Sequence, residues 1–127
     1  MLRWVVAAGI ALALPTVAQA QDAEAGKKAF AKTCGVCHAV GPGAKTKVGP
    51  ELNGVVGRKA GSIAGYNYSP VVKNSGITWD AAKLNEWITD SKKMIPGTKM
   101  IAAVKDEIER DDIIAYLETF NADGTQK

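Results

Sequence analysis

The residues with the clearest chemistry form one short motif, Cys34-Gly35-Val36-Cys37-His38. C-x-x-C-H is the attachment pattern of c-type haem. Two cysteines three positions apart lie on one side of a helical turn, so both thiols can reach the vinyl groups of a single porphyrin. The imidazole that follows can point at the iron from the same side. The motif therefore predicts one covalently bound haem c, with His38 as an iron ligand.

Other uses of the two cysteines remain as alternatives. A structural zinc site needs four ligands, and the chain offers two cysteines and a single histidine. A thioredoxin-like dithiol needs a βαβ context, and no such pattern surrounds the motif. A disulfide between Cys34 and Cys37 would close a small, strained loop. Two cysteines also exclude a scaffold held by several disulfides.

The second axial ligand cannot be another histidine of this chain, because His38 is the only one. Two methionines lie beyond the N-terminal segment, Met94 and Met100. Met100 ends the stretch 95–100 (IPGTKM), where Pro and Gly favour a loop that can lay a thioether over the haem. Met94 is expected to pack in the core. We predict Met100 as the ligand; the alternative is an open position suited to gas binding or peroxidase chemistry.

The N-terminal segment is typical of a secretory signal peptide. Arg3 is followed by an apolar run of eleven residues, Trp4–Leu14, which is too short to span a membrane. The run is followed by Ala18-Gln19-Ala20, an A-x-A cleavage site. We predict a signal peptide over 1–20 and a mature periplasmic domain over 21–127. An uncleaved N-terminal anchor is the alternative.

The charge of the chain is unevenly distributed. Residues 26–105 contain twelve lysines and one arginine against four acidic residues, a net charge of +9. Residues 106–127 contain two cations against seven acidic residues, a net charge of −5. Charged residues usually form a solvated surface. A positive face can also guide an acidic partner into place.

Three segments have the periodicity of amphipathic helices: 23–33, 81–90 and 106–120. Asp22 is a plausible N-cap of the first, and Asp80 or Thr78 of the second. The long stretch between the first two is rich in Gly and Pro but carries too many apolar residues for disorder. A compact domain seldom holds so long a loop unless it wraps something. We therefore predict an all-α domain of three main helices and long loops around one haem.

Further motifs follow in a recognisable order. They are VGPEL (48–52), GRKAG (57–61), GYNYS (65–69), GITW (76–79), IPGTKM (95–100) and DIIAYL (112–117). With the haem motif, they make the chain resemble class I c-type cytochromes of the cytochrome c2 and mitochondrial branch. The resemblance implies the small cytochrome c fold and a monomeric one-electron carrier rather than an enzyme. Expected partners are membrane or periplasmic redox proteins: a bc1-type complex, a photosynthetic reaction centre, an oxidase or a dehydrogenase.

The resemblance also assigns roles to individual residues. The carbonyl of Pro50 would accept a hydrogen bond from His38, and Tyr68 and Trp79 would bond a haem propionate whose charge Arg58 balances. Gly26 and Phe30 would pack on Ile113 and Tyr116 where the first and last helices cross. Six lysines match the cationic ring around the haem edge: Lys28, Lys47, Lys92, Lys93, Lys99 and Lys105.

Three positions depart from the family pattern. Val72 replaces an Asn common near the methionine ligand, and Trp87 replaces a Tyr whose hydroxyl points at the methionine sulfur. Ala102 replaces a Phe of mitochondrial members, which leaves the haem edge more open. Since the first two changes remove polar groups, we expect a drier methionine side with an altered hydrogen-bond pattern around Met100.

Overall fold

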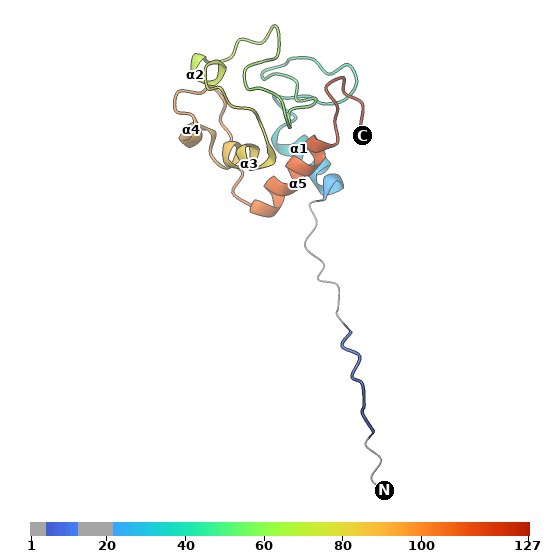
Figure 1. Cartoon of the computed structure of the whole chain (residues 1–127). Coiled ribbons are helices and arrows are strands. Elements are labelled where there is room, and N and C mark those ends of the chain that lie inside the picture. Colours follow the sequence, from blue (N-terminus) through green and yellow to red (C-terminus); the bar gives the residue numbers. More distant parts are fainter. Residues whose placement is uncertain (1–4, 13–21) are drawn as a thin grey trace.

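The computed structural model describes residues 5–12 and 22–127. Five helices lie in this part of the chain: α1 (Ala23–Thr33), α2 (Pro70–Lys73), α3 (Ala81–Thr89), α4 (Ser91–Met94) and α5 (Glu107–Glu118) (Figure 1). The described residues form no β-strand, only two isolated bridges, Lys59 with Thr78 and Phe120 with Gln126. The predicted all-α class is therefore correct, and two short helices join the three main ones.

Aspartates cap the three main helices, two of them as the sequence predicts and the third, Asp106, at a position that the sequence had placed inside the helix. The carboxylate of Asp22 accepts hydrogen bonds from the backbone of α1, and Asp106 does the same for α5. Asp80, not Thr78, caps α3, accepting from the Lys83 amide at 2.8 Å. These bonds satisfy amides that have no partner within the helix. The predicted C-terminal ends at 90 and 120 lie one and two residues beyond those observed, at Thr89 and Glu118.

α1 and α5 cross in close contact (Figure 1). A Cβ on Gly26 would lie 2.9 Å from the Tyr116 Cβ and would collide with the carbonyl oxygen of Asp112. Beside the crossing, the rings of Phe30 and Tyr116 meet edge-on with centroids 5.6 Å apart. The expected packing of these two helices is confirmed, and it depends on a residue without a side chain at position 26.

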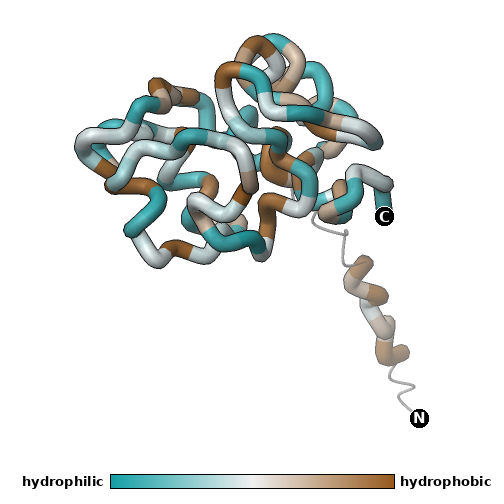
Figure 2. The backbone as a smooth tube through the Cα atoms, turned by 90° about the horizontal axis from the view of Figure 1, so that it is seen from above, coloured by the Kyte–Doolittle hydropathy of each residue, from teal (hydrophilic) through white to brown (hydrophobic). Residues whose placement is uncertain are grey.

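The loops carry a large share of the apolar residues. Figure 2 shows hydrophobic stretches along the loops as well as along the helices. Val55 and Ala60 of the long loop are 3% exposed and join the same core as α3 and α5. The C-terminal residues fold back onto this loop, since a Cβ on Gly124 would lie 2.8 Å from the Asn53 amide nitrogen. The helices thus form one side of the core, and the loops close the other.

The N-terminal segment is described only over residues 5–12. These residues form no helix, and Val5, Val6, Ile10 and Leu12 are each at least 86% exposed. The predicted cleavage site at Ala20 lies outside the described residues. None of the described helices is both long and apolar enough to cross a membrane.

Candidate haem-binding site

A cavity of about 520 Å³ opens between the helices and the long loop. Its walls include every residue that the sequence assigns to the site: Cys34, Cys37, His38, Pro50, Arg58, Tyr68, Trp79, Trp87 and Met100. The volume is within the range of about 300–1,000 Å³ typical of cofactor sites. Met94 is not part of this wall and packs against the core, as predicted.

His38 has a fixed orientation in the cavity wall. Its Nδ1 lies 2.7 Å from the carbonyl oxygen of Pro50. Because a carbonyl only accepts hydrogen bonds, Nδ1 carries the proton, and the Nε2 lone pair is free to bind a metal. Burial lowers the pKa of His38 below its usual value, which favours the neutral ring that a metal requires. The predicted role of the Pro50 carbonyl is confirmed as a contact.

Gly49 is a residue whose role the sequence did not suggest. A Cβ at this position would lie 2.8 Å from the Nδ1 and 2.9 Å from the Nε2 of His38, so any side chain would displace the ring. The Gly49 amide also donates to the Cys37 carbonyl at 2.8 Å. Only a residue without a side chain can therefore pack against this imidazole.

The two cysteines lie on the helical turn that the motif predicts. The amides of Cys37 and His38 donate to the Cys34 carbonyl at 3.1 and 2.9 Å. Burial, followed by the nearby Glu109 carboxylate, raises the pKa of the Cys34 thiol to about 11. Cys34 and Cys37 are not joined to each other by a disulfide.

The segment from Ile95 to Met100 is here called the methionine strap, and its last three residues, Thr98, Lys99 and Met100, line the cavity. It turns at Gly97, whose φ of +89° is a conformation that residues with side chains rarely adopt. The Thr98 amide donates to the Ile95 carbonyl at 3.2 Å, and the Lys92 ammonium donates to the Thr98 carbonyl at 2.7 Å. The strap is therefore bonded within itself and to α4.

Trp87 corrects our expectation for the methionine side. Its indole Nε1 lies 3.1 Å from the Met100 sulfur and donates a hydrogen bond to it. The substitution of Trp for Tyr therefore keeps a donor directed at the thioether, and the prediction that it removes a polar group was wrong. A thioether sulfur has two lone pairs, so it can accept this bond and still bind a metal. Val72, buried at 7% exposure, does supply an apolar wall.

Arg58, Tyr68 and Trp79 also line the cavity. The Tyr68 hydroxyl accepts from the Ile63 amide at 3.0 Å, which leaves its own hydrogen available to a ligand. Burial lowers the pKa of Arg58 and raises that of Tyr68. A partly buried guanidinium and a phenol that line the same cavity suit a carboxylate ligand.

Two residues that the sequence did not single out hold Arg58 in place. Arg58 donates to the Asn53 carbonyl at 3.0 Å, and a guanidinium nitrogen lies 3.9 Å from a Glu51 carboxylate oxygen. Asn53 is 5% exposed, and its side chain pairs with both the amide and the carbonyl of Gly41. The carboxylate and the folded loop together orient the cation toward the cavity.

The donor set of the cavity fits a haem. An imidazole nitrogen, a thioether sulfur and two cysteine sulfurs line walls that are otherwise largely apolar, together with the cation of Arg58 and the hydroxyl of Tyr68. Imidazole and thioether are known axial ligands of haem iron, and carboxylate-binding groups suit the propionates.

Comparison with known proteins agrees with this arrangement. A family model described as Cytochrome c matches residues 23–121, which is most of the chain. The chain belongs to the cytochrome c family. Cytochromes c bind one covalent haem c and carry electrons, so this cytochrome is an electron carrier and not an enzyme.

Individual relatives place the chain in the cytochrome c2 branch. It is 58% identical over 111 residues to cytochrome c2 of Blastochloris viridis, covering 87% of each protein. It is 51% identical over 107 residues to cytochrome c-550 of Nitrobacter winogradskyi, covering 84% of this chain and 97% of that one. The solved structure of cytochrome cH from Methylobacterium extorquens matches with a TM-score of 0.70 at 51% identity, covering 77% of this chain and 98% of that one.

Proposed function

We propose that this cytochrome carries single electrons through a six-coordinate haem, bound by thioethers at Cys34 and Cys37 and by the axial ligands His38 and Met100. The observation that carries the proposal is that His38 and Met100 line the same cavity. A hydrogen bond holds each of them: the His38 ring donates to the Pro50 carbonyl, and Trp87 donates to the Met100 sulfur. The bound haem supplies iron that changes between two states by one electron. With His38 and Met100 both holding the haem, no position would remain for a substrate.

The protein sets the conditions for that change. His38 and Met100 are both held by hydrogen bonds, so these side chains would need to move little when one electron is gained or lost. Thioether ligation and an apolar pocket both raise the reduction potential. Arg58 offsets propionate charge, for which Tyr68 and Trp79 supply hydrogen-bond donors.

The spectrum of the holoprotein tests the proposal. We expect the oxidised form to show the weak far-red charge-transfer band of a Met–iron bond, and the reduced form not to bind added carbon monoxide. Rapid binding of carbon monoxide would instead support the alternative, an open sixth position for a gas or peroxide.

We further propose that the protein works in the periplasm, as a monomer, after cleavage following Ala20. Redox complexes would dock on the six lysines of the expected ring, which are all exposed. Three of them donate to backbone carbonyls: Lys47 to Gly35 at 2.8 Å, Lys92 to Thr98 at 2.7 Å and Lys99 to Asn67 at 2.8 Å. A carbonyl does not cancel the charge, so these bonds would hold positive charge at fixed places near the cavity opening.

Electron transfer to an anionic partner should therefore depend on individual lysines. We expect Lys93→Gln to slow oxidation by the hexacyanoferrate anion by about twofold at low ionic strength, because one exposed charge contributes under about 1 kcal/mol. The measurement is the second-order rate constant across a salt series. Lys127→Gln removes an equal charge from the C-terminus and should change the rate less. Equal rates for wild type and Lys93→Gln at every salt concentration would count against the docking face.

The bond from Trp87 to the Met100 sulfur should affect the reduction potential. Donation to the sulfur draws electron density from it, so the sulfur would donate less density to the iron and the oxidised state would be disfavoured. We expect Trp87→Phe to lower the potential by about 20–60 mV, equal to the roughly 0.5–1.5 kcal/mol of one hydrogen bond. Trp87→Tyr is the matched control because it differs from Phe only by a hydroxyl. Identical potentials for the Phe and Tyr variants would show that the indole acts by packing alone.

A further inference from the structure

Arg110 lies in the acidic C-terminal segment, yet its side chain makes its hydrogen bonds elsewhere. Segment 106–127 contains seven acidic residues and only one other cation, Lys127. One terminal nitrogen of Arg110 donates to the carbonyls of Val104 at 2.8 Å and Lys105 at 3.0 Å. Neither of the two ion pairs found among the described residues includes Arg110. Its charge is thus directed at the backbone that precedes α5.

The guanidinium is held from its other side by α3. The Arg110 Nε donates to the Asn85 side-chain oxygen at 3.1 Å. The amide nitrogen of Asn85 donates to the Asp111 carboxylate at 3.0 Å, which fixes the oxygen toward Arg110. Arg110 and Asn85 are both partly buried. This chain of bonds therefore orients the arginine between α3 and the backbone that precedes α5.

The backbone that Arg110 holds is the continuation of the methionine strap. Residues 101–106 have no regular structure, and Ile101 is 82% exposed. Two backbone bonds attach this arm to the rest of the fold, from Ser91 to the Ala102 carbonyl at 3.1 Å and from Val104 to the Ile88 carbonyl at 2.8 Å. The two hydrogen bonds from Arg110 hold the far end of this arm, at the carbonyls four and five residues after Met100.

We propose that Arg110 is a positioning residue that holds the C-terminal arm of the methionine strap closed and thereby keeps Met100 on the iron. This inference rests on the proposed ligation by Met100. Without the guanidinium, two carbonyls lose their donor and the arm opens more often. Each opening removes the thioether and exposes the sixth position to an external ligand.

Imidazole binding to the oxidised holoprotein tests the inference. The apparent affinity for imidazole depends on the fraction of molecules in which Met100 is detached. We expect Arg110→Gln to bind imidazole about tenfold more tightly than wild type, which is the effect of losing one charge-assisted hydrogen bond. Arg110→Lys keeps the charge and can still reach one carbonyl, so we expect it to bind imidazole about threefold more tightly than wild type. Loss of the far-red band reports the titration.

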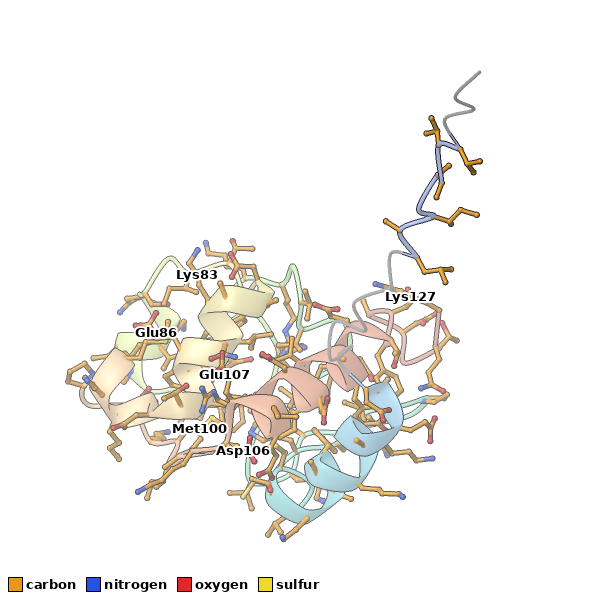
Figure 3. All side chains as sticks on the ribbon, turned by 90° about the horizontal axis from the view of Figure 1, so that it is seen from below. Lys83, Glu86, Met100, Asp106, Glu107 and Lys127 are labelled. Carbon is orange, nitrogen blue, oxygen red and sulfur yellow. The ribbon has the colours of Figure 1, made fainter. Side chains whose placement is uncertain are left out.

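Two controls separate this role from a general loss of stability. Lys127→Gln removes the other cation of the segment, which Figure 3 shows far from Met100, and should leave imidazole affinity unchanged. In a Met100→Ala background there is no thioether to detach, so adding Arg110→Gln should change the affinity by less than about twofold. Wild-type affinity in both Arg110 variants, or an equal gain with and without Met100, would overturn the inference. If Met100 were not the ligand, Met100→Ala alone would keep the far-red band. That result would overturn the proposed ligation, and it can be told apart from a failure of the role assigned to Arg110.

Discussion

Met100→Ala is expected to abolish the far-red band of the oxidised protein. We also expect the reduction potential to fall by on the order of 0.1–0.3 V, because a change of axial ligand can move the potential of a haem by up to roughly 0.8 V. The thioether is the soft ligand that favours ferrous iron, and alanine cannot replace it. Water or an added ligand would then occupy the sixth position, so the reduced variant should bind carbon monoxide rapidly. Absorption spectroscopy and potentiometric titration measure both effects.

Met94→Ala is the matched control for this experiment. Met94 ends α4 and packs against the core without lining the cavity. Removing its side chain should cost about 1–3 kcal/mol of unfolding free energy, since the site is only partly buried, and should leave the far-red band in place. A Met100→Ala protein that kept its band, or a Met94→Ala protein that lost it, would reverse the ligand assignment.

The sequence was most informative where local rules decide the structure. An aspartate before an amphipathic segment predicts a helix start, and Asp22 and Asp80 cap α1 and α3 accordingly. The spacing of Cys34, Cys37 and His38 likewise places three side chains on one turn, because the turn needs no distant partner. The short helices α2 and α4 span four residues each, too few for any periodicity to indicate them.

Contacts between distant segments were predicted less well. Trp87 was interpreted as the loss of a polar group, because a comparison of residue types describes size and polarity but not direction. In the fold, α3 points the indole N–H at Met100, thirteen residues away. Arg110 was counted as one charge in an acidic segment, whereas its hydrogen bonds reach α3 and the arm after the strap. Such roles depend on where side chains point, which follows only from tertiary packing.

Gly49→Ala is expected to have the second large effect, acting on the other face of the haem. The added methyl would occupy the space of the His38 ring, which is held both by the Pro50 carbonyl and, in the proposed holoprotein, by iron. The ring must tilt, which strains or breaks the bond to Pro50. We expect the unfolding free energy to fall by about 3 kcal/mol, combining overpacking with a weakened hydrogen bond. Denaturant titration of the oxidised holoprotein measures the loss.

Pro50→Ala distinguishes ring displacement from altered loop stiffness. Gly to Ala restricts the unfolded chain and by itself would stabilise by about 0.4–1 kcal/mol, and Pro to Ala would destabilise by a similar amount. Pro50→Ala also keeps the carbonyl that accepts from His38. If loop stiffness governed the region, Gly49→Ala would be the more stable variant of the two. If the ring contact governs it, Gly49→Ala is the less stable by about 2 kcal/mol, and it alone shifts the NMR signals of the His38 ring.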